Sequence, residues 1–211
     1  PRPGHADFVA DKKFRSFNDD RGGGHFSGRL TAGLVAAGVI AKKIIAPVDV
    51  KAKLTEVGGS EEISKMIDDA ISSGDSVGGI IECKSSDIPV GLGEPFFDSV
   101  ESLISHMIFA IPGVKGIEFG SGFKAAEMKG TEHNDLIIND QGKTASNHSG
   151  GITGGITNGN ELNFRIAVKP TSSISLPQAS YNFEAKDIQV LQIKGRHDAC
   201  IALRIPVIAE A

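Results

Sequence analysis

The first thirty residues hold side chains that could bind an anion and supply it with a proton. Six basic residues stand against four aspartates there, so this segment sums to +2 while the whole chain sums to −4. Gly22-Gly23-Gly24 leads into His25-Phe26-Ser27-Gly28-Arg29 at the expected start of a helix. Backbone N–H groups at such a start, together with Arg29, could hold a phosphate or a carboxylate. Taken alone, the same residues are slightly more typical of a turn capped by Ser27 beside a solvated arginine.

Two histidines lie among charged residues rather than in apolar stripes. His5 stands in Arg2-Pro-Gly-His-Ala-Asp7, and His197 in Gly195-Arg-His-Asp198. A Pro-Gly bend that holds an imidazole near an arginine and an aspartate could place a general acid or base beside a bound anion. Surface histidines beside charged residues are common, however. Either histidine alone is therefore more typical of a surface residue without a catalytic role than of a catalytic residue.

A lysine and three hydroxyl groups leave a predicted strand in Lys169-Pro170-Thr171-Ser172-Ser173. These groups suit a phosphate or a polar ring, and a turn with capping hydroxyls is about as typical. No metal site is predicted, because no histidine pair stands at a zinc-like i, i+4 spacing and there is no C-x-x-C motif. Cys83 and Cys200 lie in apolar segments, so we expect small core residues in a reducing, cytoplasmic setting rather than nucleophiles or a disulfide framework.

Three helices are predicted to position these groups. Leu30–Ile45 is apolar on most sides, which predicts a buried helix. The second helix follows a cap at Ser60 and ends at Ser73-Gly74. The third begins near Asp98 and ends before Ile111-Pro112-Gly113. Its expected core stripe comprises Val100, Leu103, Ile104, Met107 and Ile108.

Strands are predicted between and after the helices, at Val77–Lys84, Leu162–Lys169, Asp187–Ile193 and Cys200–Pro206. The order is not a regular βαβ repeat and no strand leads into G-x-G-x-x-G, which favours an α+β fold with antiparallel sheets over a Rossmann-type fold. The glycine clusters are typical of tight turns. The acidic balance disfavours a nucleic-acid binder, and no apolar run approaches the roughly 20 residues of a membrane span.

A series of segments, taken in order, resembles the chorismate synthase family over essentially all 211 residues. These segments are Arg2–Asp7, Arg21–Gly24 with Ser27–Arg29, Ser76–Cys83, Gly91–Pro95, Ile111–Gly116, Asn147–Gly159, Lys169–Ile174 and Gly195–Asp198.

The resemblance implies a carbon–oxygen lyase of the shikimate pathway, which leads to the aromatic amino acids. Such an enzyme makes chorismate from 5-enolpyruvylshikimate 3-phosphate by an anti 1,4-elimination of phosphate. It depends on reduced FMN (FMNH2), and NADPH would serve only as a source of flavin reduction. The resemblance further implies a cytoplasmic homotetramer with no nucleic-acid or membrane partner, and a β-α-β sandwich with helices packed between antiparallel sheets.

The resemblance also implies roles for individual residues. His5 would act near the flavin or the departing phosphate, and Asp198 would help to relay a proton at flavin N5. Arg2, Arg29 and Arg196 would bind substrate anions, and Arg196 would also lie beside the flavin. The remaining flavin contacts would be His25, Phe26, Ser27, Pro112, Gly113, Gly154, Lys169, Pro170, Thr171, Ser172 and Ser173.

This chain departs from the family pattern in two ways. His25-Phe26 stands where many members have Arg-Ser, so the backbone contacts are the safer part of that stretch. The family's N-terminal third, with its Gly-x-Ser-His-Gly histidine and further arginines, and its C-terminal helix are not found in these 211 residues. We therefore expect residues 1–211 to form a single domain, the central and C-terminal part of the family fold.

Two other functions stay open. The missing histidine and arginines favour, as the main alternative, a folded chain that binds flavin or phosphate without turnover. A hydrolase that uses Ser27, His5 and Asp7 is a weaker hypothesis, because Ser27 lacks a nucleophile-elbow pattern.

Overall fold

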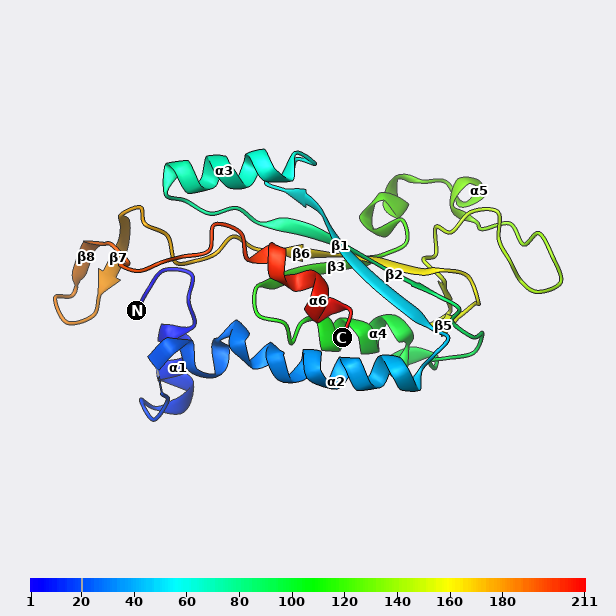
Figure 1. The fold of residues 1–211 in the computed structure, drawn as a ribbon, viewed down its shortest axis with the longest axis horizontal. Coiled ribbons are helices and arrows are strands. Elements are labelled where there is room, and N and C mark those ends of the chain that lie inside the picture. The colour runs from blue at the N-terminus through cyan, green and yellow to red at the C-terminus, as the bar shows by residue number, and fades with distance from the viewer. Residues whose placement is uncertain (20) are drawn as a thin grey trace.

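A four-stranded antiparallel sheet in the order β1-β2-β6-β3 forms the centre of the computed structural model (Figure 1). Its strands are β1 (Asp49–Val57), β2 (Gly79–Ser86), β6 (Leu162–Val168) and β3 (Val114–Phe119). Two hairpins accompany it, β4 (Ile152–Thr153) with β5 (Ile156–Thr157) and β7 (Gln178–Asn182) with β8 (Asp187–Leu191). The structure describes residues 1–19 and 21–211, so Asp20, one of the four N-terminal aspartates, lies outside the described residues.

Helices lie on both faces of this sheet. Figure 1 shows α3 (Ile63–Ser73) over one face, and α4 (Val100–Ile108), α6 (Ile205–Ala209) and α2 (Thr31–Ile44) on the opposite side. The remaining helical segments are α1 (Asp7–Phe14), α5 (Gly130–His133) and the 3-10 helices η1 (Arg21–Phe26), η2 (Gly28–Leu30), η3 (Phe96–Asp98), η4 (Gly122–Glu127) and η5 (Ile201–Arg204). This mixture with antiparallel sheets confirms the predicted α+β class.

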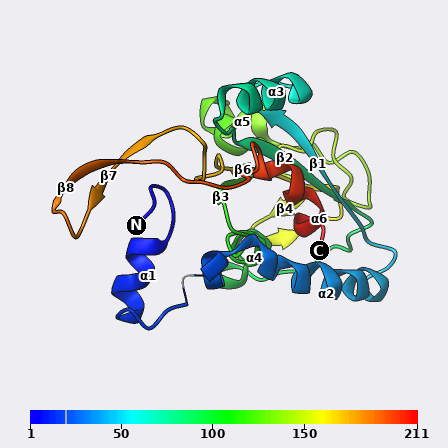
Figure 2. The same cartoon turned by 60° about the vertical axis from the view of Figure 1, so that its left-hand side comes forward.

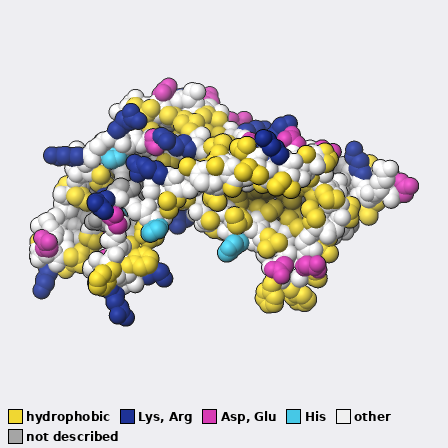
Figure 3. Space-filling view, turned by 60° about the horizontal axis from the view of Figure 1, so that its bottom comes forward, with side chains coloured by type: hydrophobic (Ala, Val, Ile, Leu, Met, Phe, Trp, Pro, Cys, Tyr) yellow, Lys and Arg dark blue, Asp and Glu magenta, His cyan; other side chains and the backbone are white. Residues whose placement is uncertain are grey.

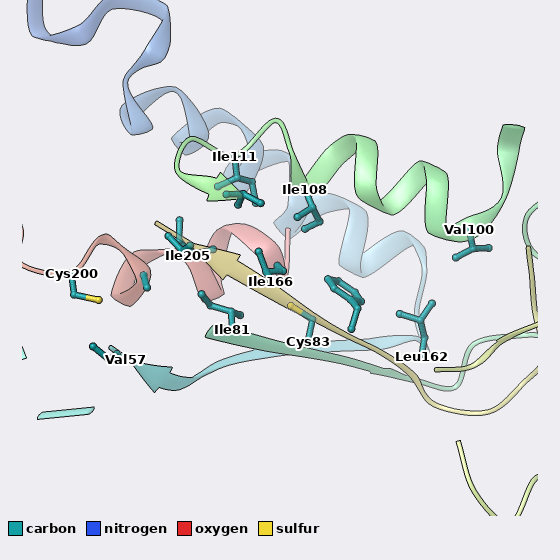
Figure 4. Packing of buried hydrophobic residues seen from close by; sticks show 14 of the residues in the cluster. Val57, Ile81, Cys83, Val100, Ile108, Ile111, Leu162, Ile166, Cys200 and Ile205 are labelled. Atoms are coloured by element: carbon teal, nitrogen blue, oxygen red, sulfur yellow. The ribbon is translucent and has the colours of Figure 1, made fainter. Parts of the chain in front are cut away.

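The core lies between the sheet and helices α4 and α6. Alternate residues of β2 and β6 point into it, and their register pairs Ile81 with Ile166 and Cys83 with Phe164. Ile81, Cys83 and Ile166 are each 0% exposed (Figure 4). The period-two alternation of burial in both strands is therefore what places one apolar face against the helices.

The predicted strand at Cys200–Pro206 is wrong. Residues 201–209 instead form η5 followed by α6, with a proline at the start of α6, where a missing N–H costs no hydrogen bond. The buried residues Ala202 and Ile205 stand three positions apart, and the half-buried Ile208 continues that spacing. This helical period outweighs the short run of β-branched residues. Cys200 and Cys83 are nevertheless buried and free, as predicted.

The predicted burial of the first helix is also wrong, although the helix itself is present. In α2 only Thr31 and Gly38 are buried, whereas Ile40 is 64% and Ile44 77% exposed. The described part of the chain covers one side of α2, where Gly38 lies against Ala211 so closely that a Cβ would be 2.4 Å from the alanine Cβ. Hydrophobic side chains consequently spread over this face of the molecule (Figure 3).

The core stripe of α4 is likewise only partly buried. Val100 and Ile108 are buried and Ile104 packs against the core, but Leu103 is 50% and Met107 57% exposed. Ser99 caps this helix by accepting a hydrogen bond from the Ser102 N–H at 3.1 Å. The helix therefore has one covered side and one uncovered apolar side, as α2 does.

Asp135 organises the long connection between β3 and β4. Its Oδ1 accepts hydrogen bonds from the Ser146 hydroxyl at 2.7 Å and the His148 N–H at 2.8 Å, and its Oδ2 accepts from the Ser149 N–H at 2.9 Å. Burial raises the pKa of Asp135, but the hydrogen bonds from Ser149, Ser146 and His148 outweigh it and bring the pKa to about 2. The ionised carboxylate is thus a structural group of this connection.

Replacing Asp135 with asparagine is expected to lower the free energy of unfolding at pH 7 by about 1–3 kcal/mol, because three donors lose a charged acceptor. The folded-state pKa lies below the usual value of 3.8, so the wild-type advantage exists above about pH 4 and falls away as the pH drops toward 2. Urea unfolding of both proteins at several pH values measures this difference in the free energy of unfolding. Asp140→Asn, an exposed change in the same connection, is the control, and an undiminished difference at pH 2–3 would contradict the assignment.

Candidate functional site

A cleft of about 1870 Å³ brings together segments that are far apart in the chain. It is bounded by the N-terminal segment, the start of α2, the loop before β3 and the loop after β6. Small-molecule pockets are commonly about 300–1,000 Å³, so this cleft has room for two ligands at once. Most of the predicted site residues line it: Arg2, His5, His25, Phe26, Ser27, Arg29, Pro112, Gly113, Lys169, Thr171, Ser172, Ser173 and Asp198.

Three predicted residues lie outside the described lining of this cleft. Gly154 is in the turn between β4 and β5, away from α1 (Figure 1). Pro170 faces a separate groove of about 310 Å³ behind the loop after β6. Arg196 is exposed in the segment that returns from β8 to η5. The assignments of these residues therefore rest on sequence resemblance without support from their position.

His5 is held at both ring nitrogens. Its Nδ1 lies 2.9 Å from the Pro3 carbonyl oxygen, and its Nε2 lies 2.8 Å from the Ser173 hydroxyl oxygen. The first contact is local and fixes the ring against its own bend. The second joins the N-terminal segment to the loop after β6, 168 positions later in the chain.

Lys169 and Ser172 reinforce this connection. The Lys169 ammonium donates to the Gly4 carbonyl at 2.8 Å and to the Ser172 hydroxyl at 2.6 Å, and that hydroxyl donates to the same carbonyl at 2.9 Å. Gly4 has φ +67°, and a Cβ there would lie 2.9 Å from Ser172 Oγ, so glycine is required. In Figure 2 the N-terminal segment accordingly lies beside the chain that carries β7 and β8.

Arg2 binds Asp7 in a two-pronged ion pair. Its Nε and Nη2 lie 2.9 Å from the two carboxylate oxygens, and its backbone N–H donates to Oδ2 at 2.9 Å. The Arg2 hydrogen bonds outweigh burial and lower the pKa of Asp7 to about 2. Asp7 is therefore an ionised partner that holds Arg2 at the edge of the cleft.

Asp198 is paired with an arginine that the sequence analysis did not single out. Arg204, in η5, donates to Asp198 Oδ1 at 2.8 Å, and both residues line the cleft. Arg204 was missed because Cys200–Pro206 was predicted to be a strand, in which residues six apart do not meet. The helical spacing of the apolar residues in that segment was the signal that could have placed Arg204 near Asp198.

Lys115 is the second missed residue. It lines the same cleft as Lys169, and neither ammonium has a carboxylate within ion-pair distance among residues 1–19 and 21–211. Burial lowers the pKa of Lys169, and the Lys115 charge lowers it further. Two neighbouring cations without acidic partners make a site that favours an anion. Lys115 stands within the predicted Ile111–Gly116 segment, beside Pro112 and Gly113.

Ser27 and Arg29 form the capped turn that was predicted as one of the two interpretations of this segment. The Ser27 hydroxyl accepts from the Arg29 backbone N–H and lies 3.3 Å from Arg29 Nη1, at the start of η2. Both side chains line the cleft, so the capping turn also presents an arginine to it. Because Ser27, His5 and Asp7 make these separate contacts, the geometry does not favour the hydrolase hypothesis.

Residues 1–19 and 21–211 contain no group of three or more His, Cys, Asp or Glu placed to hold a metal ion. Burial raises the pKa of the Cys83 thiol to about 12, which does not suit a nucleophile. The helices of the same residues include none that could cross a membrane.

Comparison with known proteins identifies the family. A sequence model described as chorismate synthase matches residues 1–211. The chain belongs to the chorismate synthase family. A chorismate synthase of Chitinophaga pinensis is 61% identical over 212 residues, which cover 100% of this chain and 64% of that relative. One of Dehalococcoides mccartyi is 44% identical over 241 residues and is covered to 66%.

The fold agrees with this family. A crystal structure of chorismate synthase matches with a TM-score of 0.71 at 26% sequence identity, over 78% of this chain and 63% of that one. The chain thus spans about two thirds of the length of these chorismate synthases. The predicted resemblance is confirmed, while the roles of individual residues stay predictions.

Proposed function

We propose that the protein containing this chain is a chorismate synthase, which releases phosphate from 5-enolpyruvylshikimate 3-phosphate to give chorismate. Family membership and 61% identity over the whole chain support the proposal. The observation that carries it is a cleft lined by two lysines without acidic partners and by a histidine held by hydrogen bonds. A phosphorylated, carboxylated substrate needs such cations to be bound, and its departing phosphate needs a proton donor nearby.

Reduced FMN is the proposed cofactor, and the residues of the cleft fit it. Lys169, Ser172 and Ser173 offer an ammonium and two hydroxyls to a phosphate or a polar ring edge. Gly113 has φ +94°, and a Cβ there would lie 2.8 Å from Ile201 Cδ1, so glycine lets the backbone at the edge of the cleft pack against that side chain. Bound reduced flavin supplies electron density for the elimination without net redox change.

Different residues of this chain are proposed to bind the anions and to transfer the protons. Lys115, Lys169 and Arg29 hold the anionic groups of the ligands and keep the phosphate oriented for departure. His5 moves a proton at a phosphate oxygen through its Nε2. Asp198, held by Arg204 at 2.8 Å, is assigned to the proton at flavin N5.

The uncovered apolar sides of α2 and α4 support the proposed sandwich. Ile40 at 64% and Met107 at 57% exposure would each gain about 1–2 kcal/mol if a further layer buried what is still exposed. We propose that these helices lie between the present sheet and a second one, and that residues 1–211 are one domain of that sandwich. The free, buried cysteines support a cytoplasmic location, and the proposed assembly is a homotetramer.

The test is an anaerobic assay with reduced FMN and 5-enolpyruvylshikimate 3-phosphate, in which chorismate is followed by absorbance. The 211-residue chain and a longer version, with the N-terminal residues of a relative added, are measured side by side. Chorismate formation by the longer version alone would make the shorter chain a flavin- or phosphate-binding fragment. Flavin and substrate binding without turnover in either version would overturn the proposal.

Replacing Arg29 with alanine is expected to weaken substrate binding by about ten- to a hundredfold, because one charged hydrogen-bonding partner of an anion is lost. Turnover at saturating substrate is expected to fall much less. Equilibrium binding of 5-enolpyruvylshikimate 3-phosphate measures the effect. Lys53→Ala, which removes an exposed cation outside the cleft lining, is the control. An unchanged substrate affinity in Arg29→Ala would refute its role as an anion ligand.

A further inference from the structure

We propose that Ser173 is the positioning and relay group of His5: its hydroxyl fixes which ring nitrogen exchanges a proton and carries that proton into the cleft. The inference rests on the proposed function for the identity of the final acceptor, a phosphate oxygen. It rests on the structure alone for the pairing of the two side chains.

The contacts of His5 leave one arrangement of protons. The Pro3 carbonyl oxygen, 2.9 Å from Nδ1, can only accept, so Nδ1 carries a proton in both the neutral and the charged ring. Nε2 is then the nitrogen that gains and loses a proton. In the neutral ring it accepts a hydrogen bond from the Ser173 hydroxyl, 2.8 Å away.

Protonation of Nε2 reverses this second hydrogen bond. The charged ring donates from Nε2 to Ser173 Oγ, so the serine proton must turn to a different acceptor. Ser173 lines the cleft, and a phosphate oxygen bound there would be such an acceptor. When Oγ takes the proton from Nε2 and releases its own proton to that oxygen, the ring becomes neutral and the phosphate gains one proton. No electrons are transferred.

The surroundings keep the pair in place. Lys169 and Ser172, bonded to each other at 2.6 Å and both to the Gly4 carbonyl, fix the loop that carries Ser173 against the residue that precedes His5. Charged groups beside this pair include the Arg2–Asp7 ion pair on the segment that carries His5 and the Lys169 ammonium, which bonds to the Gly4 carbonyl next to it. Neither bonds to a ring nitrogen, so the serine is the polar side chain that His5 contacts.

The first experiment determines by NMR which ring nitrogen of His5 carries the proton. In the full chain with nitrogen-15-labelled histidine, the neutral His5 ring is expected to carry its proton on Nδ1. Ser173→Ala is expected to move the Nε2 resonance downfield, because the hydrogen bond from the hydroxyl is lost. A neutral ring protonated on Nε2, or an Nε2 resonance that Ser173→Ala leaves unchanged, would overturn the pairing. This result does not depend on chorismate formation.

The second experiment tests the relay in the active protein. Ser173→Ala is expected to lower kcat by about ten- to a hundredfold with KM for the substrate within about threefold, since proton transfer is impaired while Lys115, Lys169 and Arg29 still hold the substrate anions. Ser173→Thr, which restores a hydroxyl, is expected to recover most of the rate. Ser175→Ala, an exposed change in the same loop, is the control. An unchanged kcat in Ser173→Ala, or no recovery in Ser173→Thr, would overturn the relay.

Discussion

Replacing His5 with alanine is expected to lower turnover by about 10²- to 10⁴-fold while flavin binding largely persists. The imidazole is the group we assign to the departing phosphate, and its contacts are to Pro3 and Ser173 rather than to the lysines that hold anions. Its loss therefore removes a proton donor and leaves Lys115 and Lys169 in place. Single-turnover kinetics with reduced FMN, together with a flavin titration, separate the two effects.

His106→Ala is the matched control for this prediction. His106 is exposed on α4 and lies outside the described lining of the cleft, so its loss is expected to leave turnover within about twofold. His5→Gln preserves a polar side chain of similar size without an ionisable ring, and is expected to be as slow as His5→Ala. A wild-type rate in either His5 variant would remove this residue from the mechanism.

Local sequence patterns predicted the elements that are governed by short-range physics. The alternation of Leu162–Lys169 predicted β6, because period-two burial leaves Phe164 and Ile166 on one face. The apolar spacing from Val100 to Ile108 predicted α4, and the expected start near Asp98 lies within two residues of the observed one. Such elements are encoded by residues that are neighbours in the chain, so periodicity and capping are sufficient to find them.

The same reasoning failed where burial depends on distant parts of the fold. Ile40 and Ile44 follow a buried-helix pattern, yet these residues are exposed because the described chain covers only the opposite side of α2. At Cys200–Pro206 the β-branched residues favoured a strand, while packing of Ala202 and Ile205 against the sheet selected a helical path. An apolar pattern indicates that a surface will be covered, but it does not indicate by which segment.

Family resemblance predicted many of the residues that line the cleft, and the structure supplied the contacts between them. No spacing rule links His5 to Ser173 or Gly4 to Lys169, because each pair is separated by more than 160 residues. Lys115 was missed for the same reason: nothing local distinguishes it from a surface cation, and only the folded chain brings it to the cleft. These long-range contacts are the part of a site that one sequence cannot specify.

Replacing Asp198 is expected to slow turnover far more than replacing its ion-pair partner Arg204. Asp198→Ala is expected to lower turnover by about 10²- to 10⁴-fold, because it removes the carboxylate assigned to the proton at flavin N5. The Asp198–Arg204 ion pair itself is exposed, with side chains 45% and 67% accessible, so it is worth at most about 1 kcal/mol. Arg204→Ala is therefore expected to cost no more than about fivefold in rate.

Measuring kcat and substrate affinity in both variants shows whether turnover depends on the Asp198 carboxylate itself or on its ion pair with Arg204. Asp198→Ala leaves Arg204 as an extra unpaired cation in the cleft, so anion binding is expected to hold or to tighten while the chemical step slows. Asp198→Asn keeps the shape of the side chain without its charge and is expected to be equally slow. Equal losses in Asp198→Ala and Arg204→Ala would assign the effect to the ion pair, and the carboxylate would then have no proton to handle.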